Sequence, residues 1–167
     1  HRALWDMSMF NLPNLHAMIA LLRDGFHPQS EGGSIELAGD GTPIIDYVIN
    51  DYLWDGVRRS WLSMAEIQFA AGAKAVRASH VDSPWFTSWE EAKAGINALE
   101  FRSNAFTAGS AHCMGGLTMG EDQTRCLVDS NGKYHHLDNL YVFDGSVFPT
   151  SIGANPQLSI YGMACKQ

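Results

Sequence analysis

Two side chains, far apart in this sequence, have the chemistry needed to act on a small polar molecule. His112 stands in the stretch SAHCMGG, where small neighbours leave room for another group to approach its imidazole. Histidine is the usual general base near neutral pH. A single histidine among small residues more often has a structural role, so its immediate surroundings leave both interpretations open.

The second side chain, Asn155, belongs to the segment FDGSVFPTSIGANPQLSIYGMACK at 143–166. An apolar stretch leads into Asp144 and Gly145, a loop of small residues follows, and a helical pattern begins at Pro156. Backbone N–H groups at a helix start attract anionic or electron-rich atoms. The structural alternative is that Asn155 caps this helix and Asp144 forms an Asx-turn.

The composition narrows the class of protein. The 167 residues are 46% hydrophobic and 17% charged, which provides enough apolar material for a core. A formal net charge of −7 argues against nucleic acid or an anionic membrane surface as a partner. Apolar runs are far shorter than the roughly 20 residues of a membrane span.

Cysteine and histidine spacing predicts neither a disulfide framework nor a metal site. The three cysteines lack CxxC or CxxH spacing. The remaining histidines lack metal-ligand spacing, and His135 and His136 follow a predicted turn where we expect them to be exposed. A hydrolase that pairs His112 with Ser110 or Cys113 is a weak alternative, because near neighbours in sequence seldom point at one another and the sequence lacks GxSxG.

The elements that must position these residues follow from hydrophobic periodicity and turn signals. Helical spacing predicts helices within 15–26, at 51–74 and at about 89–99, the last preceded by the capping box of Ser88 and Glu91. Alternating residues predict a hairpin at 32–50, a strand at 73–80 and a buried strand at Leu140–Phe143. The pattern is typical of an α+β protein with an antiparallel sheet and helices on one face.

Two ordered stretches resemble the C-terminal signature of the glucose–methanol–choline (GMC) family of flavin-dependent oxidoreductases. HCMGGLTMG at 112–120 is close to the family pattern H-x-x-G-T-x-x-M-G. NLYVFDGSVFPTSIGANPQLSIYGMA at 139–164 is close to N-L-x-V-x-D-x-S-x-x-P, followed by N-P and a helix. The connecting stretch, CLVDSNGKYHHLDNLYVFD, also fits. A departure is Gly116, which stands where the family usually has Thr.

The resemblance implies a reaction and roles for particular residues. It implies that His112 is the base, that Asn155 is its active-site partner, and that a CH–OH group of an alcohol or sugar-like substrate is oxidised by hydride transfer to FAD. It also implies that Asp144 and Gly145 lie near the ribityl-pyrophosphate part of FAD. Asn155, Pro156 and Gln157 would lie against its isoalloxazine ring.

The resemblance also implies a division of the chain. Residues 1–105 would be a portion of the substrate-binding domain. Residues 106–167 would complete an FAD-binding α/β domain with its last strand and helix. The sequence lacks the GxGxxG fingerprint for the ADP part of FAD, so the resemblance implies an N-terminal part of the same protein as a partner. We expect the chain alone to be an inactive fragment; the alternative is a non-catalytic binding module that retains the fold.

Overall fold

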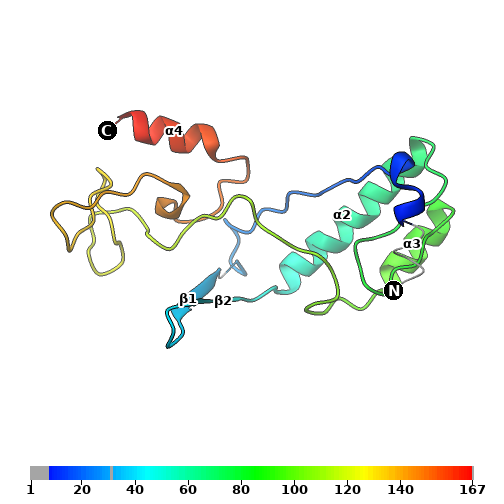
Figure 1. Ribbon diagram of the computed structural model, residues 1–167, viewed down its shortest axis with the longest axis horizontal. Coiled ribbons are helices and arrows are strands. Elements are labelled where there is room, and N and C mark those ends of the chain that lie inside the picture. The colour runs from blue at the N-terminus through cyan, green and yellow to red at the C-terminus, as the bar shows by residue number, and fades with distance from the viewer. Residues whose placement is uncertain (1–7, 31, 167) are drawn as a thin grey trace. The chain divides into compact units, whose positions relative to one another are not determined.

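The computed structural model describes residues 8–30 and 32–166 (Figure 1). The chain forms two compact units. The first contains the described residues up to Leu22 together with Ile49–Ala108, and the second contains Arg23–Val48 and the described residues from Gly109 onward. The described part is α+β, as predicted, with a two-stranded antiparallel sheet. No helix in these residues is both long and apolar enough to cross a membrane.

The main helix of the first unit, α2 (Asp51–Ala70), forms where the helical spacing predicted it. It begins at Asn50, whose side chain accepts a hydrogen bond from the Leu53 N–H at 3.1 Å. It ends where Gly72 adopts a left-handed φ of +92°, a conformation that glycine tolerates best. The face that carries Leu53, Val57, Trp61 and Ala65 is buried.

The second helix of this unit, α3 (Trp89–Ala98), confirms the predicted N-terminus. The Ser88 hydroxyl accepts from the Glu91 N–H at 3.2 Å. The Glu91 carboxylate reaches one residue further than a capping box requires, and accepts from both the N–H and the hydroxyl of Thr87 at 3.0 and 2.9 Å. These two bonds hold the pKa of Glu91 below its usual value.

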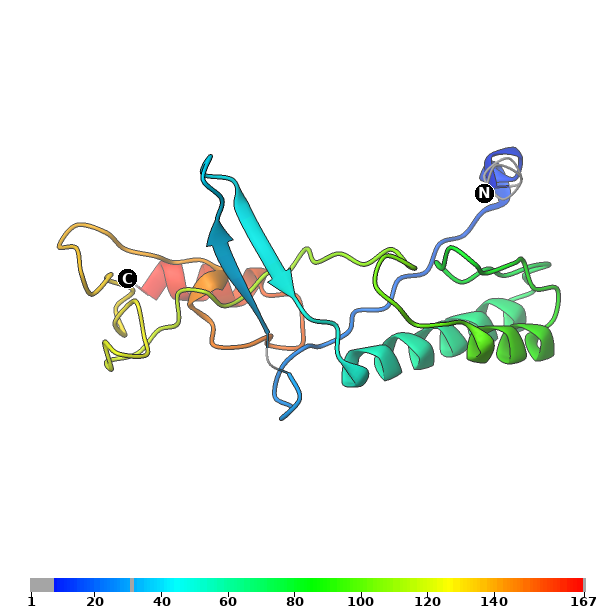
Figure 2. The ribbon, with the colours of Figure 1, turned by 90° about the horizontal axis from the view of Figure 1, so that it is seen from below.

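The core of the first unit lies where α2 and α3 pack side by side (Figures 1 and 2). Its buried members come from both helices and from the segment between them: Val57, Trp61, Ala65, Val76, Ala78, Phe86, Ala92 and Ile96. Gly95 allows close approach, because a Cβ there would lie 2.2 Å from the Phe86 ring. Trp61 and Phe86 therefore pack in the core.

The stretch at 73–80 was predicted as a strand, and the structure shows that this is wrong. Val76 pairs with Phe86 and His80 with Phe106, but these are single bridges and not a continuous ladder. Val76 and Ala78 are buried in the helical core. The alternation that indicated a strand therefore reflects packing of an irregular segment against helices.

The helix predicted within 15–26 is also absent. A 3-10 turn, η1 (Leu12–Asn14), ends at Leu15, whose φ and ψ of −83° and 136° are extended. Beyond it, Ile19 and Leu21 are 82% and 67% exposed. A short helix without a surface to pack on is marginal in water, so the apolar spacing alone does not produce one.

The second unit contains the predicted hairpin, with β1 (Gly33–Leu37) antiparallel to β2 (Pro43–Tyr47) and Ile35 opposite Ile45. The turn closes through a 2.9 Å bond from the Ala38 N–H to the Thr42 carbonyl. Both strands are exposed throughout. The hairpin is the only sheet within residues 8–30 and 32–166.

The rest of the second unit is mostly irregular. It contains a short 3-10 helix, η2 (Gly145–Val147), and the closing helix α4 (Gln157–Lys166), which confirms the predicted helix one residue later than expected. The predicted buried strand at Leu140–Phe143 is wrong: Tyr141 forms a single bridge with Lys133, and Leu140 and Tyr141 are 41% and 52% exposed.

The core assignment predicts a contrast between two isoleucines on the paired helices. Ile96→Ala should lower the free energy of unfolding by about 3 kcal/mol, because its side chain is only 1% exposed. Ile67→Ala should lower it by less than about 1 kcal/mol, because Ile67 is 54% exposed. Urea unfolding followed by tryptophan fluorescence measures both, and equal losses would contradict the assigned core.

Candidate functional site

The segment after His112 runs alongside the segment after Asp144, and the two are joined through the backbone. The N–H groups of Gly115, Leu117 and Met119 donate to the carbonyls of Gly145, Ser146 and Val147 at 3.3, 3.0 and 3.2 Å. This pairing brings together the two motifs singled out in the sequence. The pairing also fixes the orientation of the two segments, because every second residue from Gly115 to Met119 donates a backbone hydrogen bond.

Gly145 makes this close approach possible. It is buried, and a Cβ at this position would lie 2.6 Å from the carbonyl oxygen of Cys113. Real Cβ atoms essentially never come so near a backbone atom, so a side chain here would force the two segments apart. The glycine that follows Asp144 is therefore required by packing, whatever else it contacts.

Asp144 forms the Asx-turn that the structural alternative proposed. Its Oδ1 accepts from the Ser146 N–H at 2.8 Å and from the Ser146 hydroxyl, which caps η2. The Ser146 hydroxyl and N–H hold the pKa of Asp144 below its usual value. The carboxylate is exposed.

His112 and Asn155 meet in the second unit although 43 positions separate them. The carboxamide Nδ2 of Asn155 lies 3.1 Å from Nε2 of the His112 imidazole. An amide N–H can only donate, so Nε2 is the acceptor and the proton of the neutral ring is on Nδ1. The imidazole is half-buried and the carboxamide is exposed.

The structural alternative for Asn155 was that its side chain caps the helix that follows. The hydrogen bond that the structure shows for its side chain goes to His112. Asn155 is followed directly by Pro156, which is buried, and by Gln157, the first residue of α4. The Gln157 side chain donates to the Tyr161 hydroxyl at 2.7 Å, one turn along the same helix.

The hydrolase alternative has no support in the geometry. The Ser110 hydroxyl accepts from the backbone N–H of His112 at 3.3 Å, and the Cys113 thiol donates to the Ser110 carbonyl at 3.7 Å. Neither contact involves the imidazole, whose partner is Asn155. The described residues also contain no group of three or more His, Cys, Asp or Glu side chains that could hold a metal ion.

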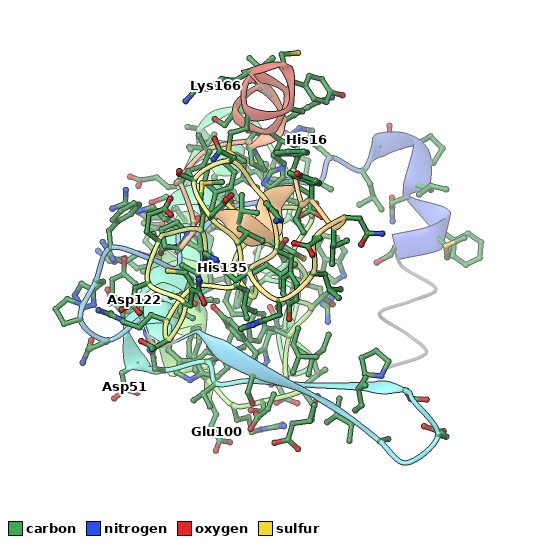
Figure 3. All side chains as sticks on the ribbon, turned by 90° about the vertical axis from the view of Figure 1, so that its left-hand side faces the viewer. His16, Asp51, Glu100, Asp122, His135 and Lys166 are labelled. Carbon is green, nitrogen blue, oxygen red and sulfur yellow. The ribbon has the colours of Figure 1, made fainter. Side chains whose placement is uncertain are left out.

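His135 makes a contact with the segment after His112 that the sequence did not reveal. It was expected to be exposed, but it is half-buried. Its side chain lies among the loops of the second unit (Figure 3), and its Nε2 is 2.9 Å from the Gly120 carbonyl. Its backbone N–H donates to the Leu127 carbonyl at 3.0 Å. His135 therefore supports the far end of the segment that begins at His112. A histidine after a turn carries no sequence signal for such a contact.

Comparison with known proteins adds independent information about the chain. A protein-family model described as GMC oxidoreductase matches residues 28–164. An uncharacterized GMC-type oxidoreductase of Sinorhizobium fredii is 29% identical over 142 residues, covering 82% of this chain and 27% of that protein. A long-chain-alcohol oxidase of Arabidopsis thaliana is 25% identical over 161 residues, covering 89% of this chain and 20% of that protein.

A shorter match is more similar in sequence. The 6'''-hydroxyparomomycin C oxidase of Streptomyces lividus is 40% identical over 73 residues, which cover 44% of this chain and 13% of that protein. The matched part of this chain therefore spans between 13% and 27% of the length of these three relatives.

The close approach at Gly145 predicts a large effect from one methyl group. Gly145→Ala should lower the free energy of unfolding by about 2 kcal/mol, because the added Cβ overlaps a backbone oxygen. Gly109→Ala is the matched control, since nothing lies within 4 Å of a Cβ there, and it should change stability by less than about 1 kcal/mol. Denaturant unfolding of both variants measures this, and a neutral Gly145→Ala would refute the pairing.

The Asx-turn predicts a change in the titration of Asp144. Ser146→Ala removes the hydroxyl that contributes most to lowering its pKa, so the pKa should rise toward the ordinary value of about 3.9. A lowered carboxyl pKa stabilises the fold above the ordinary pKa, and this contribution is lost as the pH falls. Carbon-13 NMR titration of the carboxyl group measures the shift.

Asp122 serves as the internal control for that titration. Its Oδ1 accepts from the N–H and hydroxyl of Thr124 in the same way, at 3.0 and 2.6 Å. Its pKa, also lowered, should not respond to Ser146→Ala. An unchanged Asp144 pKa in this variant would show that the hydroxyl bond is not formed.

Proposed function

Because this chain belongs to the GMC oxidoreductase family, we propose that the protein is an FAD-dependent oxidoreductase that oxidises a CH–OH group, with His112 and Asn155 at its active site. The observation that carries the proposal is the 3.1 Å approach of the Asn155 carboxamide to the His112 imidazole. The names of two relatives, long-chain-alcohol oxidase and 6'''-hydroxyparomomycin C oxidase, support an alcohol or sugar-like substrate.

The pair offers complementary groups to a hydroxyl. Nε2 of His112 has a lone pair that can accept the hydroxyl proton, and Nδ2 of Asn155 can donate to the same oxygen as negative charge develops on it. In the structure these groups bond to each other. A substrate hydroxyl inserted between them would replace that one bond with two.

The residues around the pair are compatible with a planar cofactor. Asn155 is exposed, Gly116 has no side chain, and nothing lies within 4 Å of a Cβ position at Gly116, so the space beside it is open. When bound, FAD supplies the hydride acceptor. Asn155, Pro156 and Gln157 would contact its isoalloxazine ring, where the positive end of α4 favours negative charge.

Asp144 and Gly145 are proposed to lie near the ribityl-pyrophosphate part of FAD. Their structural roles do not conflict with this, because the Asp144 carboxylate is exposed. Direct contact of a carboxylate with a phosphate would be repulsive, so we place Asp144 by the ribityl hydroxyls, which can donate to it. Gly145 would contribute only its backbone.

The domain assignment remains part of the proposal. Residues 1–105 are proposed to contribute to a substrate domain in which helices cover one face of a sheet. Residues 106–167 are proposed to complete the FAD domain, in partnership with an N-terminal part of the protein that carries the ADP-binding fingerprint. The compact units divide the chain by packing and not by function: they place the hairpin with the C-terminal segment.

Anaerobic rapid mixing of the FAD-loaded protein with alcohols tests the roles of the pair. The probes are a long-chain primary alcohol and 6'''-hydroxyparomomycin C. His112→Ala should slow flavin reduction by about 10²- to 10⁴-fold, as expected for loss of a general base. Asn155→Ala should slow it by about 10²-fold through loss of one donor to the developing charge.

His136→Ala is the matched control, because His136 is exposed and lies in the same unit. It should reduce flavin at the unaltered rate, and all variants should keep the flavin absorbance spectrum. Full activity of His112→Ala would refute the assigned base. A protein that binds no flavin even when this chain is combined with the N-terminal part would instead favour the non-catalytic binding module.

A further inference from the structure

A second segment of the chain lies against the loop that leads to Asn155. Residues 23–26, called the strap below, approach loop residues 150–153 within the second unit. A Cβ at Gly25 would lie 2.1 Å from the Thr150 hydroxyl oxygen, and 3.1 and 3.2 Å from the backbone N and O of Ser151. Only a residue without a side chain fits there.

The strap touches the loop at a second point through Arg23. A Cβ at Gly153 would lie 2.5 Å from Cδ and 3.2 Å from Nη1 of Arg23, so the arginine side chain packs directly on this glycine. Gly153 has a left-handed φ of +75°, which other residues adopt only with strain. The Arg23 guanidinium also lies 5.3 Å from the centre of the Phe26 ring, a cation–π contact within the strap.

The loop has little of its own to hold it. The hydrogen bond found inside residues 150–153 joins the Gly153 N–H to the Ser151 hydroxyl at 3.3 Å. Asn155 lies two residues beyond Gly153. A displacement of about 1 Å breaks a hydrogen bond and costs a catalytic site about 10²-fold in rate. The contacts of Gly25 and Arg23 therefore add restraint to a loop that ends two residues before Asn155.

We propose that the strap is a positioning element, in which Gly25 and Arg23 fix the loop so that the Asn155 carboxamide reaches the His112 imidazole. The proposal rests on the proposed function of that pair. It concerns residues that precede the matched part of the family model, which starts at residue 28. The strap contacts the loop, and through it acts on Asn155.

Gly25→Ala tests this by adding one methyl group against Thr150. The nitrogen-15 shift of His112 Nε2 should move to that of a ring nitrogen without a hydrogen-bond donor. In the FAD-loaded protein, kcat should fall by about 10- to 100-fold with a smaller change in KM. Gly39→Ala is the matched control in the same unit, because nothing lies within 4 Å of a Cβ there, and it should change neither quantity.

Rescue by a second substitution separates a positioning role from general damage. Thr150→Ala removes the hydroxyl that lies closest to the new methyl group but leaves the 3.1 and 3.2 Å contacts with the Ser151 backbone. Gly25→Ala/Thr150→Ala should therefore restore the His112 signal and kcat in part. Arg23→Ala adds no bulk and should shift the His112 signal in the same direction by releasing Gly153. Arg23→Ala therefore tests the proposal even if Gly25→Ala does not fold.

The outcomes distinguish this proposal from the function on which it rests. An unchanged His112 signal in Gly25→Ala or Arg23→Ala overturns the strap, and so does a changed signal that Thr150→Ala moves no part of the way back in the double variant. The signal reports the geometry of the pair without turnover. Failure of the proposed function would instead appear as full activity of His112→Ala while the strap variants still shift the signal.

Discussion

The geometry of the candidate site depends on a short stretch of backbone pairing. Three N–H groups, from Gly115, Leu117 and Met119, bond to carbonyls at 145–147. Each such bond contributes only about 1 kcal/mol, so the pairing is sensitive to anything that separates the two segments. Gly145 meets this constraint because it has no Cβ to collide with the Cys113 carbonyl. The spacing of glycines around His112 and Asp144 is thus a condition for the segments to meet.

From this pairing the candidate site is built outward through loops. His135 supports Gly120 at one end of the paired segment, and the strap packs on the loop before α4. The imidazole and carboxamide consequently meet at the edge of an irregular region, where single contacts replace ladders. In such a region each segment is held by few hydrogen bonds, whereas a strand in a sheet is held by many. A one-methyl change at Gly145 or Gly25 should therefore matter more than most changes in the helices.

What could be predicted from the sequence was largely what is local. Ser88 caps α3 through Glu91, three residues on, and the predicted hairpin closes across a few residues. The apolar stretch within 15–26 has helical spacing but no surface to pack on, which no local pattern reveals. The motifs singled out His112 and Asn155, but the 3.1 Å approach between them depends on long-range packing. No pattern in the residues next to His135 or Arg23 indicates the contacts that these side chains make.

Amide hydrogen exchange tests the central claim most directly, because it reports the backbone pairing itself. The account predicts that the amides of Gly115, Leu117 and Met119 exchange slowly and lose protection together, well behind the amide of Gly109, which precedes the paired segment. Exchange of these three amides as fast as that of Gly109 would mean that the segments are not joined. The arrangement of His112 beside Asn155 would then have no structural basis.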